Sequence, residues 1–235
     1  LLASAALVVL RRNPEAQRQE PKTAEPPGWR QQALWLFFSA LGSVILLSVT
    51  NHLCQSVAPI PFLWTVPLLL YLLTFVACFE REWYTQWRVM PPAGAALLGM
   101  AWAVAYLPPG RMLQIGIPIF AAGCFFGCFY CHGELAARKP PAAHLTHFYI
   151  VMAAGGALGS LLVAFGAPMV FAGYAELPVA LSLCAMAMLF SVYRRSLAID
   201  ILATVCAVLL TALAFSSLRK PGTQVDAKRN FYGSL

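Results

Sequence analysis

The chain has 235 residues, of which 60% are hydrophobic and 11% are charged, with a formal net charge of +7 and a mean hydropathy of +0.71. Soluble domains are about one quarter charged, so this composition cannot cover a water-facing surface. It excludes an ordinary soluble enzyme, a disordered tail and a disulfide-stapled secreted module, and it predicts an integral membrane protein.

The chain begins with an apolar stretch, residues 1–10, that ends at Arg11 and Arg12. It carries no basic leader, so we interpret it as the end of a preceding transmembrane helix rather than as a signal peptide. Residues 11–32 are polar and contain four prolines. We expect them to form a cytoplasmic connector.

Residues 33–217 are expected to form an all-α, polytopic transmembrane helix bundle of about seven spans. The reason is a series of runs without Asp, Glu, Lys or Arg, the longest of which, 31–79, holds 49 residues. A helical span needs about 20 mostly apolar residues, so this run holds two. The expected helices are 33–50, 59–79, 92–107, 113–131, 147–171, 176–193 and 196–217.

Prolines are expected to mark several of the loops, Pro91 and Pro92 among them. Pro67, Pro118 and Pro168 instead fall within or near the spans. There a neighbouring helix or a polar side chain must satisfy the carbonyl groups that these prolines free.

The positions of the basic residues orient the bundle. Eleven Lys and Arg residues lie in the connector and in the loops on its side, whereas the opposite loops hold Arg111 alone. The positive-inside rule places the eleven in the cytoplasm. Seven spans would then leave the tail outside although it carries four basic residues, so either one span is miscounted or a basic tail is external.

One motif matches a haem attachment pattern. Cys128-Phe-Tyr-Cys131-His132 reads C-x-x-C-H, but covalent haem belongs to the oxidising outer compartment, and the charge pattern places this motif at a cytoplasmic helix end. We expect Cys124, Cys128 and Cys131 to form a small, polarisable face of a helix instead. No cofactor and no disulfide framework are expected.

Four ionisable residues surround one short expected loop: His132, Glu134, His144 and His147. Imidazole and carboxylate groups suit zinc or another divalent metal, but they also contact substrates and hydrogen-bond helix ends. We expect a structural or substrate-binding cluster, without a metal, on the cytoplasmic side.

Two further polar features are candidates for a substrate path. Asn51, His52 and Gln55 are expected in an uncharged turn between the first two spans, where they would line an entry or cap two helix ends. Asp200 lies about one turn into the last expected helix, near Arg194 and Arg195. It would stabilise that helix end or serve as a proton or cation site.

Five glycines are expected at contacts between helices: Gly123, Gly127, Gly155, Gly156 and Gly159. Small residues let helix backbones approach closely in lipid. A nucleotide-binding loop at Gly155 is excluded, because the G-x-G-x-x-G spacing and a preceding strand are both missing.

Three stretches together carry a resemblance to a known family. They are 48–75, which reads SVTNHLCQSVAPIPFLWTVPLLLYLLTF, then CHGEL at 131–135 with LTHFY at 145–149 and GGALG at 155–159, and finally RNFYGSL at 229–235. The chain resembles bacterial proteins described as fused major-facilitator/spermidine synthase. In that family a multi-span membrane domain is joined to a spermidine-synthase-like Rossmann domain.

The resemblance implies a multi-pass protein of the bacterial inner membrane. Residues 218–235 would be a linker and the start of a soluble synthase-like domain, which with the lipid bilayer is the expected partner; no nucleic acid is expected. Aminopropyl transfer would need a nucleotide-binding loop and acidic amine-binding residues, and no residue here matches them, so no catalytic residue is assigned. The expected role is to anchor the soluble domain and to transport for it. Open alternatives are a stand-alone transporter for a small solute or polyamine and a membrane metal-binding protein.

Overall fold

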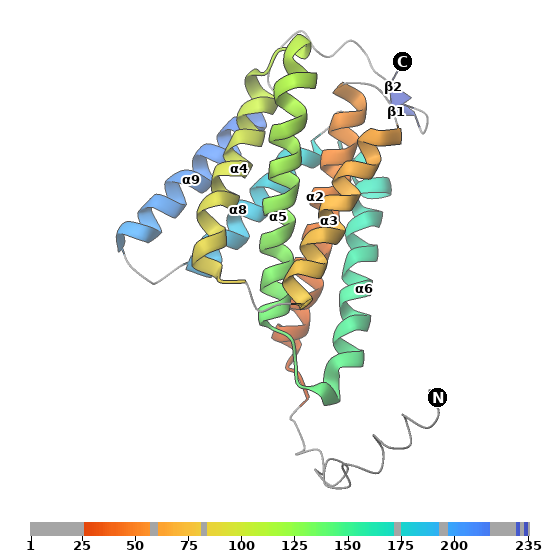
Figure 1. Ribbon diagram of the computed structural model, residues 1–235, viewed down its shortest axis with the longest axis vertical. Helices are drawn as coiled ribbons and strands as arrows, with labels where there is room; N and C mark the ends of the chain where they lie inside the picture. Colours follow the sequence, from red (N-terminus) through yellow and green to blue (C-terminus); the bar gives the residue numbers. More distant parts are fainter. Residues whose placement is uncertain are drawn as a thin grey trace, which may run out of the picture.

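The computed structural model is a bundle of helices (Figure 1). It describes residues 26–56, 61–80, 84–171, 175–192, 197–216, 229–230 and 233–234. The expected end of an earlier helix at 1–10, most of the connector and most of the linker lie outside the described residues.

The described helices match the seven expected from the sequence. The α-helices are α2 (Trp29–Ser56), α3 (Pro61–Glu80), α4 (Gln86–Tyr106), α5 (Ile117–Ala137), α6 (Leu145–Leu161), α7 (Ala167–Val170), α8 (Glu176–Val192) and α9 (Leu197–Ser216). Before α5, a short 3₁₀ turn, η1 (Pro109–Arg111), is followed by a π-helical turn, η2 (Met112–Gly116). A second 3₁₀ turn, η3 (Ala142–His144), precedes α6. A second π-helical turn, η4 (Leu162–Gly166), joins α6 to α7. Because α7 continues α6 through η4, the two correspond to one expected helix.

Five helices among the described residues are long and apolar enough to cross a membrane. They are Trp29–Gln55, Leu63–Glu80, Gln86–Tyr106, Met112–Ala137 and Ala142–Val170. The expectation of about seven spans is therefore wrong by this measure. α8 has 17 residues, about 25 Å at 1.5 Å per residue, which is short of a hydrocarbon core of roughly 30 Å. α9 is not among the five, and the side chains of its first turn lie outside the described residues.

Helices α2 and α5 lie at the centre of the bundle (Figure 1). α2 packs against α3, α5, α6 and α8, and α5 packs also against α4. α2 buries a stripe of side chains three or four residues apart, which is the spacing of one helix face: Trp35, Phe38, Leu41, Ile45 and Val49. The outer faces of α3 and α6 expose leucines such as Leu69 and Leu158, as expected for helices that face lipid.

Successive helices of the bundle run in opposite directions (Figure 1). The first turns of α2, α4 and α6 therefore lie at the same end as the last turns of α3 and α5. This end holds Arg30, Arg88, Arg138 and Lys139, and we call it the arginine end. Arg111, in η1, lies at the opposite end. α9 also ends away from the arginine end, so the conflict between the positive-inside rule and the basic tail remains.

Two prolines within the apolar helices each follow a π-helical turn. Pro118 comes two residues after η2, and Pro168 comes two residues after η4. Proline lacks an N–H and its ring crowds the carbonyl four residues earlier. The wider turn relieves this locally, because the N–H of Ile117 donates to the carbonyl of Met112, five residues back, and Ala167 does the same in η4.

Pro91 and Pro92 correct a sequence expectation. They lie inside α4, which begins at Gln86 rather than at residue 92. The helix tolerates them near its start because the carbonyls that lose a helical donor belong to Trp87 and Arg88, both in its exposed first turn.

Strands occur among the described residues near the end of the chain. β1 (Arg229–Asn230) pairs antiparallel with β2 (Gly233–Ser234), with Arg229 opposite Ser234. Both strands lie in the expected linker, 218–235, outside the expected bundle of 33–217, whose described residues form helices and turns but no strand.

Candidate functional site

His132 and Glu134 lie inside α5, not in a loop. Both side chains are buried, with 1% and 2% of their surface exposed. His144 is half-buried in η3, and His147 is exposed in the first turn of α6. The expected polar loop is therefore divided into a buried pair and a separate surface pair. Within the described parts of the chain, no three His, Cys, Asp or Glu residues are arranged to hold a metal ion.

The imidazole of His132 is enclosed by α2 and α3. Its Nδ1 atom lies 2.9 Å from Thr74 Oγ1. The rings of Tyr71 and Phe75 meet the imidazole edge-on, with centroids 4.6 and 5.4 Å away. On the α2 side, a Cβ atom placed on Gly42 would lie 3.6 Å from Nε2. Gly42 therefore leaves space beside the second ring nitrogen.

The hydrogen bonds of Thr74 favour one tautomer of His132. Thr74 Oγ1 lies within hydrogen-bond distance of the carbonyl oxygen of Tyr71, at 2.8 Å, as well as of the imidazole. When the hydroxyl donates to that carbonyl, it acts as an acceptor towards the imidazole, and Nδ1 of His132 then carries the proton. In the neutral ring Nε2 then holds a lone pair, on the side of Gly42.

Glu134 is held by two partners that we call, together with it, the carboxylate clamp: Tyr84, Glu134 and Arg138. Tyr84 donates its hydroxyl to Oε1 at 2.5 Å, and Nη1 of Arg138 forms an ion pair with Oε2. The same Nη1 donates to the Glu134 carbonyl at 2.9 Å. A buried carboxylate requires such partners, because an unpaired charge away from water is strongly unfavourable.

The carboxylate clamp connects several helices at the arginine end. The Arg138 guanidinium lies 5.2 Å above the ring of Phe38 on α2. Trp35, also on α2, donates from its indole nitrogen to the Arg138 carbonyl at 3.1 Å. The Trp35 ring meets Phe148 of α6 edge-on at 5.0 Å. The clamp therefore links α5 to α2, and through Trp35 to α6.

Tyr84 lies in the connection between α3 and α4, outside the helices that could span a membrane. Burial of its phenol and the neighbouring Glu134 carboxylate raise the pKa of Tyr84 above its usual range. The hydroxyl therefore stays protonated at neutral pH, as a donor to Glu134 must be.

Asn51, His52 and Gln55 lie in the last turns of α2, which corrects their expected position in a turn between helices. The His52 ring lies 4.7 Å from that of Phe120, near the start of α5. Phe120 precedes His132 by twelve positions, about 18 Å along a helix. The two groups of candidate residues therefore lie at opposite ends of the bundle and do not form one site.

Helices α6 and α2 approach each other closely where they cross. A Cβ atom on Gly155 would lie 2.5 Å from the carbonyl oxygen of Leu36, and one on Gly159 would lie 2.9 Å from Cα of Ala40. These neighbours are backbone atoms, which cannot move aside as a side chain can. Any larger residue at these two positions would push the helices apart.

The other three glycines expected at helix contacts also face neighbouring helices. Gly156 faces Ser43 of α2, Gly127 faces Ile45 of α2 and Leu97 of α4, and Gly123 faces Met100 of α4. All of these neighbours are side chains, which can shift. These contacts are therefore more adaptable than the backbone contacts of Gly155 and Gly159.

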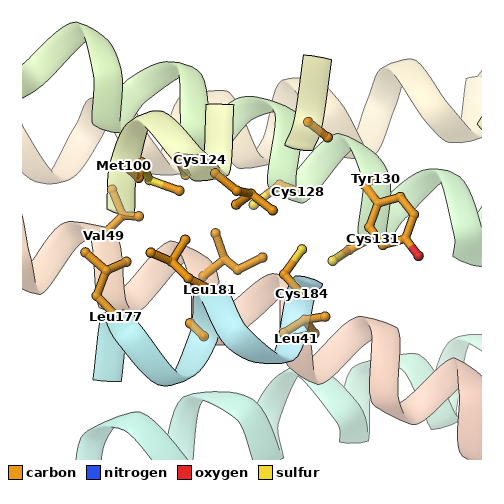
Figure 2. Packing of buried hydrophobic residues seen from close by; sticks show 14 of the residues in the cluster. Leu41, Val49, Met100, Cys124, Cys128, Tyr130, Cys131, Leu177, Leu181 and Cys184 are labelled. Carbon is orange, nitrogen blue, oxygen red and sulfur yellow. The ribbon is translucent and has the colours of Figure 1, made fainter. Parts of the chain in front are cut away.

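Cys124, Cys128 and Cys131 form one fully buried face of α5 (Figure 2). Cys184 of α8 points toward Cys131, and Cys128 donates through sulfur to the carbonyl of Gly42 at 3.8 Å. The C-x-x-C-H pattern therefore lies within packed helices. The side chain of Asp200 lies outside the described residues.

Sequence reasoning missed three partners of the buried pair: Thr74, Tyr84 and Gly42. None belongs to a motif, and each comes from a different part of the chain. One usable signal was the glycine between two ionisable residues in His132-Gly133-Glu134, because such a glycine on an otherwise apolar helix indicates close packing.

Comparisons with models of protein families, with curated proteins and with solved structures found no match for this chain. The class of protein is therefore inferred from the fold and the site alone. The long apolar helices indicate a multi-pass membrane protein, and its distinctive feature is a buried histidine beside a clamped carboxylate at the arginine end.

Proposed function

We propose that this chain is the membrane domain of a fused spermidine-synthase-like protein. Its role is to anchor the soluble synthase-like domain of that protein at the inner membrane of a bacterium. The identity of the soluble domain rests on the resemblance of residues 48–75, 131–159 and 229–235. The proposal assigns no catalytic residue to this chain.

The observation that carries the anchoring role is the tight crossing of α2 and α6. At Gly155 and Gly159 the two backbones leave no room for even a Cβ atom. At the arginine end the carboxylate clamp adds an ion pair and hydrogen bonds that join α5 to α2. Interfaces of this kind favour one fixed arrangement of helices, which suits an anchor better than a carrier that must rearrange.

The state of Glu134 also favours anchoring over polyamine transport. A cationic substrate in a membrane needs carboxylates to balance its charge. Glu134 already binds Arg138 and Tyr84, so a polyamine would have to displace an arginine to reach it. The three-ligand groups that a metal-binding protein would need are missing from the described residues.

Transport remains a second candidate because of His132. Its neutral imidazole is buried between three helices, with a lone pair on Nε2 beside Gly42. Buried ionisable residues within membrane helices commonly mark proton or solute pathways. A path through His132 would carry protons or a small uncharged solute.

Anchoring is tested by fusing a fluorescent reporter after Leu235 and fractionating cells. We expect the fusion to sediment with membranes and to resist extraction with alkaline carbonate, whereas the reporter alone stays in the soluble fraction. A fusion that carbonate releases would contradict the proposed role.

Transport is tested with the purified chain in liposomes. An anchor gives no proton flux under a pH gradient, read from a pH-sensitive dye trapped in the liposomes, and no uptake of labelled spermidine above that of empty liposomes. Uptake that is lost in His132→Ala, with the melting temperature maintained, would replace the anchoring proposal with a transporter.

A further inference from the structure

A groove of about 410 Å³ lies between α2, α5 and α8 near the arginine end. One part of its lining is apolar: Leu34, Phe37, Phe38, Met186, Ala187 and Phe190. Phe190 and Met186 are 80% and 63% exposed, so the groove opens to the side of the bundle. The other part of the lining is polar and consists of Arg138 and Ser191.

Arg138 is held in place but keeps donors for another partner. Glu134 and the Phe38 ring fix the guanidinium, and both hydrogen bonds to Glu134 use Nη1. A guanidinium carries five N–H donors, and within the described part of the chain no acceptor is bonded to the three on Nη2 and Nε. The side chain is 31% exposed. An orientation fixed in advance reduces the entropy lost when an anion binds.

Ser191 supplies a second polar group at the groove. Its Oγ lies 3.0 Å from the hydroxyl of Tyr130. When Tyr130 donates this hydrogen bond, the Ser191 proton is available for an acceptor in the groove. The polar part of the lining therefore offers a cation and a hydroxyl donor, both suited to phosphate oxygens.

We propose that this groove binds a phospholipid with an anionic headgroup. Its phosphate would contact Arg138 and Ser191, and one acyl chain would lie along Phe37, Met186 and Phe190. The groove has a polar part at the end of the bundle and an apolar part open to the side, which matches an amphiphile that enters from the bilayer. Basic pockets between membrane helices are known sites for anionic lipids. This inference goes beyond anchoring and is independent of the identity of the soluble domain.

Native mass spectrometry of the full chain in detergent tests the proposal. 1-Palmitoyl-2-oleoyl phosphatidylglycerol and the corresponding phosphatidylcholine are added in parallel. We expect one tightly bound phosphatidylglycerol and weaker binding of phosphatidylcholine. Arg138→Gln should weaken phosphatidylglycerol binding about tenfold, which corresponds to one lost charge-assisted contact.

Matched variants separate this site from general charge and from misfolding. Lys139→Gln removes an exposed neighbouring charge and should leave binding unchanged. Phe190→Ala removes an exposed part of the apolar lining without altering Arg138 and should weaken binding. Phe165→Ala makes the same change at an exposed position in η4 and should have no effect.

Three results would overturn the proposal. Equal binding of the two lipids would show that the headgroup charge is not recognised. Equal losses in Lys139→Gln and Arg138→Gln would show that the attraction is not local. A monomer that binds neither lipid would show that the chain itself fills the groove. A dimer that binds neither lipid would show that a second copy fills it.

Discussion

The aromatic ring of Tyr84 lies directly on Gly133, and a Cβ atom at residue 133 would overlap that ring. The two neighbours of Gly133 in α5 are the buried residues His132 and Glu134. The missing side chain lets Tyr84 approach the helix closely enough for its hydroxyl to reach Glu134 at 2.5 Å. The arrangement of the carboxylate clamp therefore depends on a glycine.

The substitution Gly133→Ala tests this dependence. The added methyl group would force the Tyr84 ring away from α5 and weaken its hydrogen bond to Glu134. We expect a loss of about 1–3 kcal/mol of stability, which is typical of overpacking. Thermal unfolding in detergent measures it.

A second background isolates the contact with Tyr84. In Tyr84→Ala the methyl group has space, so Gly133→Ala should be neutral or should stabilise by up to about 1 kcal/mol through helix propensity. Gly94→Ala, where a Cβ atom would meet open space, is the control. Equal effects of Gly133→Ala in both backgrounds would show that Tyr84 is not responsible.

Gly159→Leu should separate α6 from α2. The new side chain would meet the backbone of Ala40, which cannot move aside, so we expect a marked fall in melting temperature and in the yield of folded protein. Gly166→Ala is the control, because its Cβ atom would make an ordinary contact of 3.6 Å with Leu162. A Gly159→Leu protein as stable as the wild type would refute the close crossing.

Thr74→Val should leave the Nδ1 proton of His132 without an acceptor. A buried donor without a partner costs about 1–3 kcal/mol, whereas Thr74→Ser keeps the hydroxyl and should be close to neutral. Nitrogen NMR of labelled histidine should show Nδ1 protonated and Nε2 unprotonated in the wild type. The opposite tautomer would contradict the hydrogen-bond assignment.

The carboxylate clamp also predicts an alkaline limit to stability. The pKa of Tyr84 is higher in the folded protein than in the unfolded chain, so its contribution is complete below the unfolded value of about 10 and is lost as the pH rises above it. Tyr84→Phe should be less stable at neutral pH, through the lost hydrogen bond, but should lose less stability above about pH 10. If the melting temperatures of the wild type and of Tyr84→Phe fall by the same amount from neutral to alkaline pH, this assignment is contradicted.

The sequence predicted every described helix of the bundle but misplaced several ends. α2 begins at Trp29, inside the expected connector 11–32, and three other helix ends are misplaced for one shared reason. The end of α2 at Ser56, the start of α4 at Gln86 and the end of α5 at Ala137 lie beyond the polar residues or prolines that were taken as loop signals. Charge-free runs reveal membrane helices because lipid excludes charge. They do not reveal a polar residue whose partner lies on another helix.

The sequence predicted the candidate site only in part, because it does not reveal which residues of other helices contact His132 and Glu134. The sequence groups His132 and Glu134 with His144 and His147 because they are near one another in the chain, whereas the structure buries the first two and leaves the other two at the surface. Their actual partners, Thr74 and Tyr84, lie about fifty residues or more earlier in the chain. Only the packing of α3 and of its connection to α4 against α5 brings them together.

We propose that α5 crosses the membrane with the arginine end in the cytoplasm. Gly110 and Ala142 are exposed on either side of this helix, so each can be replaced by cysteine in a variant whose seven native cysteines are changed to alanine. An impermeant maleimide added to intact cells should label Gly110→Cys, and should label Ala142→Cys only after the membrane is permeabilised. Labelling of both positions in intact cells would show that α5 does not span the membrane, and labelling of Ala142→Cys alone would invert the orientation.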